Sequence, residues 1–161
     1  MIALISDTHE NEAAIQKAVS IIRDRKPEFT VHLGDIISPA MLGYFKELRM
    51  KLLFGNNDGE RDGLAKEALK LGFDEPQDEI EFVHKGKRIY AYHGTDRERL
   101  EQRIWYGGYD YVLTGHTHLR RDGRIKNTRV INPGALFRCS PFTIAFLDVE
   151  KDTVEFIEIP K

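Results

Sequence analysis

Cysteine is almost absent from this chain of 161 residues, which holds only Cys139. A single thiol excludes a disulfide within the chain and a metal cluster built on cysteine, and it favours a reducing, cytoplasmic location. Long apolar runs are missing as well. The first apolar stretch, 2–5, is too short for a secretory signal, and no run approaches the length of a membrane span. We therefore expect no membrane partner.

Neither sign of charge is in excess, because 24 basic residues stand against 26 acidic ones and give a net charge of −2. Without a basic surplus, the chain lacks the general attraction for phosphate backbones on which nucleic-acid binding depends. Nucleic acid is therefore not expected as a partner beyond small nucleotides. The length is that of one ordinary domain with a sizeable core, so residues 1–161 are predicted to form a single domain.

The chain does hold an alternation of short apolar runs and helical patterns. Apolar runs predict strands at 2–5, 29–33, 51–54, 80–83, 89–92 and 111–113. Apolar residues at helical spacing predict helices around 15–22, 41–48, 64–71 and 100–104. From residue 119 onward the pattern predicts β-structure alone, near 125 and at 130–131, 142–149 and 154–159. This order favours a mixed α/β fold in which two packed mixed β-sheets are flanked by helices, a four-layer αββα sandwich.

Six polar motifs follow apolar runs, most of them beside a glycine that permits a tight turn. In chain order they are Asp7-x-His9, Gly34-Asp35, Gly55-Asn56-Asn57-Asp58, His93-Gly94, Gly115-His116-Thr117-His118 and Asn132-Pro133-Gly134. The first five offer carboxylate, amide and imidazole groups, which suit divalent cations such as Mn, Fe, Ni or Zn. Because open α/β sheets place their sites at the carboxyl ends of strands, we expect these side chains to converge. A pair of such cations is typical of phosphate-ester chemistry.

Each motif taken alone also has a simpler explanation. Asp7 and His9 can serve only to cap the following helix, and Asp35 can be a turn residue that accepts local backbone N–H groups. Asn56 lies in a common loop composition, and His93 can be a hydrogen-bonded core histidine. The Gly-His-Thr-His motif is the most specific signal, because two imidazoles two residues apart at a strand end can diverge toward two neighbouring ions.

The ordered set of six motifs, which spans residues 7–134, resembles the signature of the calcineurin-like metallophosphoesterases. The chain looks closest to their small bacterial and archaeal phosphodiesterase branch. The resemblance implies a cofactor of two divalent metal ions (Mn, Ni, Fe or Zn) and a hydroxide, bridging them, that attacks a small phosphodiester substrate. It implies that one ion is held by Asp7, His9, Asp35 and His118, and the second by Asp35, Asn56, His93 and His116, with Asp35 bridging.

The chain departs from the family pattern at the position of the general acid. Many relatives have a histidine directly after the asparagine, where it protonates the leaving group, whereas this chain has Asn57, which cannot act as a strong acid. We therefore predict activity biased toward good leaving groups, or an acid supplied elsewhere in the chain. Arg120, Arg121 and Arg138 lie near the site loops, where each is either a contact for substrate phosphate or solvated surface.

The alternative function is a non-catalytic protein-interaction scaffold of the same fold. A eukaryotic retromer subunit resembles this branch of the family and serves mainly as an interaction platform. A scaffold is free to lose metal ligands, and this chain keeps every ligand of the family's set. Trp105, Tyr106 and Tyr109 belong either to the core or to an interface, so a homo-oligomer stays open.

Overall fold

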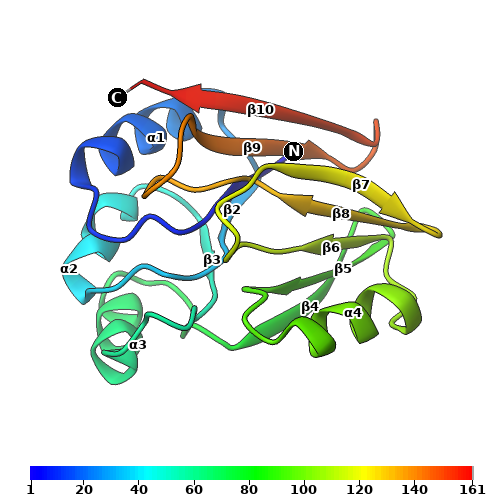
Figure 1. Ribbon diagram of the computed structural model, residues 1–161. Helices are drawn as coiled ribbons and strands as arrows, with labels where there is room; N and C mark the ends of the chain where they lie inside the picture. The colour runs from blue at the N-terminus through cyan, green and yellow to red at the C-terminus, as the bar shows by residue number, and fades with distance from the viewer. Residues whose placement is uncertain (161) are drawn as a thin grey trace.

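The structure is a computed structural model that describes residues 1–160, and it consists of two β-sheets packed between helices (Figure 1). The strands are β1 (Ile2–Ile5), β2 (Phe29–His32), β3 (Met50–Leu52), β4 (Glu79–His84), β5 (Lys87–Tyr92), β6 (Tyr111–Leu113), β7 (Arg121–Ile125), β8 (Thr128–Asn132), β9 (Phe142–Asp148) and β10 (Thr153–Ile159). The helices are α1 (Glu12–Arg25), α2 (Pro39–Leu42), the 3₁₀ turn η1 (Gly43–Phe45), α3 (Arg61–Lys70) and α4 (Arg97–Tyr106). The predicted mixed α/β sandwich is confirmed.

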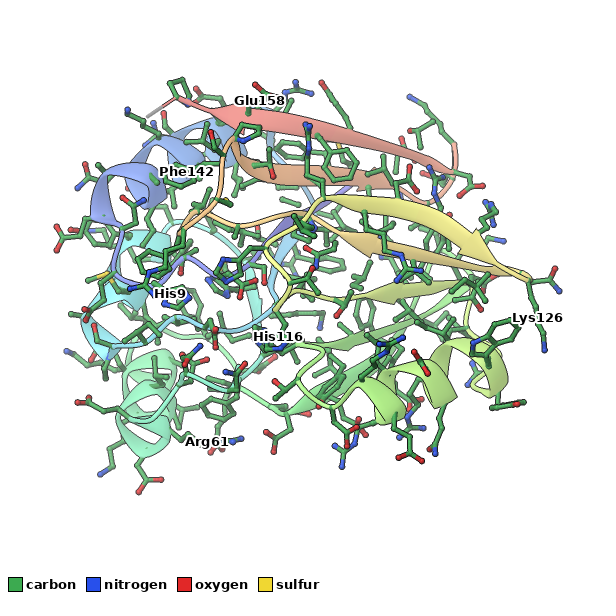
Figure 2. All side chains as sticks on the ribbon, viewed as in Figure 1. His9, Arg61, His116, Lys126, Phe142 and Glu158 are labelled. Carbon is green, nitrogen blue, oxygen red and sulfur yellow. The ribbon has the colours of Figure 1, made fainter. Side chains whose placement is uncertain are left out.

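Each of the two sheets contains three adjacent parallel strands. The first has the order β10-β9-β1-β2-β3, and the second has the order β4-β5-β6-β8-β7. Strands β1, β2 and β3 run parallel to one another, as do β5, β6 and β8. Each of these six parallel strands leads directly into one of the six sequence motifs. The motifs therefore gather at one end of both sheets, where Figure 2 shows His9 and His116, while Lys126 lies at the other end.

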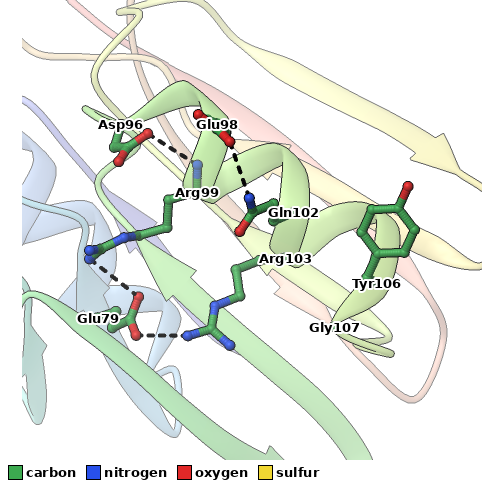
Figure 3. Close-up of a pocket in the computed structure, with 8 residues that line it drawn as sticks. All are labelled: Glu79, Asp96, Glu98, Arg99, Gln102, Arg103, Tyr106 and Gly107. Carbon is green, nitrogen blue, oxygen red and sulfur yellow. Dashed lines mark hydrogen bonds and ion pairs between the residues drawn. The ribbon is translucent and has the colours of Figure 1, made fainter.

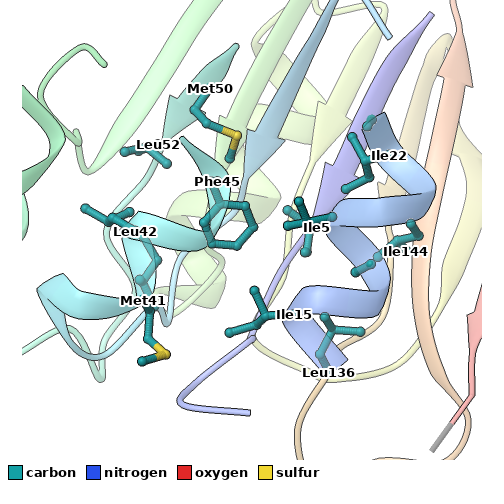
Figure 4. Packing of buried hydrophobic residues seen from close by; sticks show 14 of the residues in the cluster. Ile5, Ile15, Ile22, Met41, Leu42, Phe45, Met50, Leu52, Leu136 and Ile144 are labelled. Atoms are coloured by element: carbon teal, nitrogen blue, oxygen red, sulfur yellow. The ribbon is translucent and has the colours of Figure 1, made fainter. Parts of the chain in front are cut away.

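Strand β1 is fixed from both faces, because its apolar side chains alternate between two cores. Ile2 and Leu4 lie in the core between the sheets, whereas Ala3 and Ile5 pack on the side of α1. Figure 4 shows Ile5 among the aliphatic and aromatic side chains of that second cluster. Burying each large aliphatic side chain contributes about 1.5–3 kcal/mol. The loop that follows β1 and carries the first motif thus starts from a rigid strand.

Helix α1 is tied at its start to a distant loop. Asn11 caps the helix, since its side chain accepts a hydrogen bond from the backbone N–H of Ala14 at 3.3 Å. The same side chain donates to the carbonyl of Leu136 at 2.7 Å. The helix ends at Arg25, and its C-cap residue Lys26, with a left-handed φ of 50°, comes just before the proline that predicted the end. The cap therefore joins the loop after β1 to the loop after β8.

Two predicted elements differ from the structure in extent. The helix predicted at 41–48 is wrong in its second half, because α2 ends at Leu42 and continues only as the 3₁₀ turn η1. Gly43 at this junction has low helix propensity, and the N–H of Leu48 bonds to the carbonyl of Phe45 in a tighter turn. The strand predicted at 51–54 spans Met50–Leu52 instead, and Leu53 makes only an isolated bridge. None of the helices within residues 1–160 has the length and apolar character to cross a membrane.

Candidate metal centre

The first group of candidate ligands consists of Asp7, His9 and His118, whose donor atoms lie within 4.8 Å of one another. Nε2 of His118 is 3.3 Å from Oδ1 of Asp7. The rings of His9 and His118 have centroids 5.8 Å apart. Ligands that bind one ion at about 2.1 Å each are separated by roughly 3–4 Å, so this group has the spacing of a metal site.

A second group consists of Asp7, Asp35 and His93. Nε2 of His93 is 3.5 Å from Oδ1 of Asp35 and 3.9 Å from Oδ1 of Asp7. The same nitrogen is 3.1 Å from the side-chain oxygen of Asn56. The ring of His116 lies 5.3 Å from the ring of His93, centroid to centroid. All seven sequence-predicted ligands therefore come together at this end of the sheets.

Asp7 belongs to both groups, and Asp35 of the second group also approaches an imidazole of the first. One oxygen of Asp35, Oδ1, faces His93, and the other, Oδ2, is 3.6 Å from Nε2 of His9. Its side chain is 1% exposed and lies between imidazoles that come from opposite sheets. The bridging role that the resemblance implies for Asp35 stays a prediction.

The unsatisfied atoms of the site fit a bound cation. Oδ1 of Asp7 and Nε2 of His9 are buried and have no hydrogen-bond partner. Burial raises the pKa of Asp7 and lowers the pKa of His9. A buried carboxylate oxygen without a partner is costly, and a divalent cation beside it removes that cost while leaving the imidazole neutral as a ligand. The donor set of oxygen and imidazole is also one that divalent transition metals prefer.

Neighbouring groups aim the free donor atoms into the site. Oδ2 of Asp7 accepts hydrogen bonds from the hydroxyl of Ser6 at 2.6 Å and from the backbone N–H of His116 at 3.0 Å. Oδ1 is left to face the imidazoles. Nδ1 of His93 lies 2.7 Å from the carbonyl of Leu33, which can only accept, so Nδ1 donates and Nε2 presents its lone pair. Such outer contacts fix the orientation of metal ligands.

The backbone at the site is strained. Five of the seven candidate ligands have left-handed φ angles: Asp7 (49°), His9 (46°), Asp35 (60°), His116 (67°) and His118 (60°). Non-glycine residues in this region cost of order 1–3 kcal/mol each and persist only where the surrounding structure holds them. The strain indicates that this end of the molecule is built to position side chains rather than to maximise stability.

Asp58 is the main residue that holds this strained backbone, although sequence reasoning assigned it no role beyond its place in the third motif. Its side chain is 3% exposed. Oδ2 accepts from the backbone N–H groups of Asp35 at 2.9 Å and Gly55 at 2.7 Å. Oδ1 accepts from Ile36 and Ile37, both at 2.7 Å. One carboxylate therefore fixes the loops after β2 and β3 against each other, including Ile37, whose φ of 80° is rare for a β-branched residue.

Asn57, at the position of the family's acid, contacts Asp35. Its backbone N–H donates to Oδ1 of Asp35 at 2.9 Å, and its side-chain amide donates to Oδ2 at 2.7 Å. The residue is exposed and lines the cleft described below. An amide in this place holds the carboxylate and has no acidic proton to give to a leaving group.

The sixth motif positions the histidine loop. The side-chain amide of Asn132 donates to the carbonyl of Gly115 at 2.7 Å and lies 3.1 Å from the hydroxyl of Thr117. Its oxygen accepts from the N–H of Gly134 at 2.9 Å. Asn132 thus ties the loop after β8 to the Gly-His-Thr-His loop after β6, although it offers no ligand to either group.

His32 is buried beside the centre without belonging to it. Its Nδ1 accepts from the N–H of Gly34 at 3.2 Å, so Nε2 donates to the hydroxyl of Thr8 at 3.0 Å. Burial lowers the pKa of His32 to about 3, which keeps the ring neutral. The residue supports the turns that carry the first two motifs.

Gly55 lets the β3 loop approach Asp35 closely, which leads to a prediction. A Cβ added at Gly55 would lie 2.1 Å from Oδ1 of Asp35, so Gly55→Ala must displace that carboxylate. We expect the affinity for Mn²⁺, measured by calorimetry, to fall at least about tenfold, as it does when the support of a ligand is lost. Gly59→Ala in the same loop is the control, because an added Cβ there meets no atom within 4 Å. Equal affinities of the two variants would contradict the role of Asp35.

A cleft of about 760 Å³ lies beside the candidate metal centre. It is lined by His9, Glu10, Asn11, Ile37, Asn57, His118, Phe137 and Arg138. Because it takes in two candidate ligands and the residue at the acid position, a substrate in this cleft would reach the centre. Of the three arginines named from the sequence, only Arg138 is among the lining residues. Arg120 instead pairs with Glu158 at 3.5 Å, over the ring of Phe156.

A second hollow of about 450 Å³ lies along α4 (Figure 3) and has a different character. Glu79 at its base is 3.0 Å from Arg103 and 3.9 Å from Arg99. The hydroxyl of Tyr90 also donates to Glu79, at 2.5 Å. The charged groups in this hollow thus satisfy one another, which is typical of a surface ion-pair network that supports a helix.

Residues 1–152 match the family model of the calcineurin-like phosphoesterase superfamily domain. The chain belongs to this superfamily. Among curated relatives, it is 36% identical over 159 residues to the phosphodiesterase MJ0936 of Methanocaldococcus jannaschii, a match that covers 93% of each chain. A solved structure of an archaeal phosphodiesterase superposes with a TM-score of 0.92 at 32% identity, covering 98% of this chain and 99% of that one.

A more distant structure agrees in fold. The Escherichia coli phosphoesterase YfcE has a TM-score of 0.71 at 16% identity, with 99% of both chains covered. Membership in the superfamily confirms the resemblance seen in the motifs and identifies the chain as a hydrolase of phosphate esters. Divalent metal ions are the cofactors of a calcineurin-like phosphoesterase, and the two ligand groups show where this chain offers donors for them.

Proposed function

We propose that the protein is a dinuclear metal-dependent phosphodiesterase that hydrolyses small phosphodiesters. One observation carries this proposal: Asp35 lies within 3.6 Å of an imidazole of each ligand group, in a chain that keeps the whole ligand set. The curated relative that is named a phosphodiesterase supports the diester as the substrate class.

The proposed ligands divide between two ions as the family pattern implies. Asp7, His9, Asp35 and His118 would hold the first ion, and Asp35, Asn56, His93 and His116 would hold the second. Mn, Ni, Fe or Zn fits these donors. Divalent ions held by these residues would lower the pKa of a bound water, which would supply hydroxide as the nucleophile near neutral pH.

The residues around the ligands supply positioning. Asp58, Asn132 and Ser6 hold the loops that carry the donors. The hydrogen bond from His93 to Leu33 keeps one imidazole in the tautomer that a metal requires. Fixed donors need no rearrangement during the reaction, which is the condition under which electrostatic stabilisation of a transition state is most effective.

The proposal is tested by removing metal from the purified protein and restoring Mn²⁺ or Ni²⁺. We expect elemental analysis to give two ions per chain, and the loaded protein to hydrolyse bis(p-nitrophenyl) phosphate faster than p-nitrophenyl phosphate. A protein that takes up none of Mn, Ni, Fe or Zn would instead support the scaffold alternative. If the loaded protein hydrolysed only monoesters, the proposed metal centre would stand and the proposed phosphodiester substrate class would be wrong.

The amide at position 57 leads to a prediction about leaving groups. Because general acid catalysis contributes about 10²–10⁴-fold, its absence at Asn57 should make the rate fall steeply as the leaving group becomes more basic. We expect kcat/KM for bis(p-nitrophenyl) phosphate to exceed that for diphenyl phosphate by a wide margin, and Asn57→His to narrow the ratio at least about tenfold. Asn57→Ala is the control, because it also loses the side-chain hydrogen bond to Asp35 but gains no acid. A ratio unchanged in Asn57→His would contradict this prediction.

Several further expectations stay predictions. Tyr109 is 4% exposed and belongs to the core, whereas Trp105 and Tyr106 are 45% and 83% exposed on α4. The Lys126 ammonium lies over both of these exposed rings, 4.8 and 5.7 Å from their centroids. A homo-oligomer, a single domain over residues 1–161 and a cytoplasmic location all stay predictions.

A further inference from the structure

Phe137 and Arg138 form a stack with a candidate metal ligand at the edge of the cleft. The ring of Phe137 lies on the imidazole of His9, with centroids 4.1 Å apart and planes inclined by 25°. The guanidinium carbon of Arg138 is 5.0 Å from the centroid of the same phenyl ring. Neither contact follows from the family motifs, since both residues come after the last of them.

The stack is anchored by the loop that precedes it. The N–H of Leu136 donates to the carbonyl of Asp7 at 3.2 Å, and the carbonyl of Leu136 accepts from Asn11 at 2.7 Å. Arg138 itself has a left-handed φ of 45°. Strained, over-determined backbone of this kind is concentrated at sites of function. Phe137 and Arg138 thus have their places set by the same segments that carry the first ligands.

Arg138 is a cation without an anionic partner. Among the eight residues that line the cleft it is the only lysine or arginine, and no carboxylate within residues 1–160 forms an ion pair with it. Glu10 lines the same cleft and makes no ion pair with it. Many other arginines of the chain are paired, as Arg120 is with Glu158. The guanidinium is therefore left for an anion from outside the chain.

The stack connects this cation to the candidate metal centre through Phe137. The guanidinium of Arg138 contacts Phe137, 5.0 Å from the ring centroid, and it is this phenyl ring, 4.1 Å away between centroids, that stacks on the candidate ligand His9. Guanidinium groups bind phosphate through two parallel hydrogen bonds. We propose that Arg138 binds a second phosphate of the substrate, so that the cleft selects phosphodiesters whose esterified group carries an additional phosphate. This inference rests on the proposed phosphodiesterase function.

The proposal is tested with two thymidine dinucleotides, one of which carries a 5′-phosphate that the other lacks. Both have a phosphorothioate linkage, which slows hydrolysis. Calorimetry on the Mn²⁺-loaded protein is expected to show that the phosphorylated dinucleotide binds at least about tenfold more tightly. Arg138→Gln is expected to bring the two dissociation constants close together by weakening the phosphorylated ligand. Arg138→Lys should keep part of the preference, because it keeps the charge and loses the planar fork. Arg120→Gln is the matched control and should keep all of it.

Three results would overturn the inference. One is equal binding of the two dinucleotides by the unsubstituted protein, and another is binding of neither. The third is a loss of affinity in Arg138→Gln that is the same for both dinucleotides, because the guanidinium would then contact the reacting phosphodiester itself. If the loaded protein hydrolyses bis(p-nitrophenyl) phosphate, each of these results leaves the proposed function standing. If it does not, the proposed function fails as well.

Phe137 is a positioning residue in this account, and its variants separate that role from general stability. Phe137→Leu keeps an apolar side chain of similar volume but loses the flat ring that holds Arg138. We expect it to reduce the preference for the phosphorylated dinucleotide several-fold, with little change in the urea midpoint of unfolding. A preference as large as that of the unsubstituted protein would show that Arg138 needs no ring beneath it and would contradict this role.

Discussion

Replacing Asp35 and His116 together with alanine is expected to reduce the metal-dependent hydrolysis of bis(p-nitrophenyl) phosphate at least about a thousandfold, because metal ions supply several kcal/mol of transition-state stabilisation. Asp35 lies near an imidazole of each ligand group, and His116 lies beside His93 in the second. The double variant therefore removes the bridge and one further donor. Bound metal, measured by elemental analysis, should fall together with activity.

A surface substitution provides the comparison for this double variant. Asp24→Ala removes an acidic side chain that is 72% exposed and far along α1 from the ligands, so it should leave both metal content and hydrolysis unchanged. Activity that survived in the Asp35 and His116 double variant would refute the assignment of the centre. If the double variant kept two ions per chain but lost activity, only the bridging role of Asp35 would be refuted.

Asp58→Asn is expected to lower the free energy of unfolding of the metal-free protein by about 3 kcal/mol or more. The buried carboxylate accepts four backbone N–H bonds, and hydrogen bonds to charged groups contribute about 1.5–3 kcal/mol each. Asparagine offers one oxygen and turns an N–H₂ group toward two of these donors. Urea unfolding measures the change, and Mn²⁺ affinity should fall with it, because Asp35 is held by this carboxylate.

The control for Asp58→Asn is Asp24→Asn, which makes the same chemical change on the surface and should stay within about 0.5 kcal/mol of the unsubstituted protein. If Asp58→Asn were as stable as this control, the loops after β2 and β3 would have to be held by other contacts. The backbone strain at Asp35 and Ile37 would then need a different explanation.

The fold and the convergence of the candidate ligands are predictable from the sequence for one physical reason. Strands buried on both faces read as short apolar runs, and the residue after such a run lies at the sheet edge where parallel strands end. Asp7, Asp35 and His93 each follow a run of this kind, so their convergence can be expected before any coordinates are known. The helix at 41–48 was less predictable, because Gly43 changes α-helical bonding to a 3₁₀ turn within a continuous apolar pattern.

What the sequence does not reveal is how the ligands are held. The left-handed φ angles of residues such as His9 and His118 depend on contacts between loops that are distant in the chain. Asp58 is the last residue of the third motif, but the four hydrogen bonds that its carboxylate accepts form only when the loops after β2 and β3 come together. The stack of Phe137 on His9 joins residues 128 positions apart and has no periodicity to indicate it.

The central claim is that Asp35 bridges two divalent ions. It is tested most directly by a crystal structure of the Mn²⁺-loaded protein with anomalous scattering data collected for the metal. The account predicts two anomalous peaks about 4 Å apart, with the Asp35 carboxylate between them and His9 and His93 on opposite ions. A single peak, no peak, or two peaks that Asp35 does not contact would contradict it.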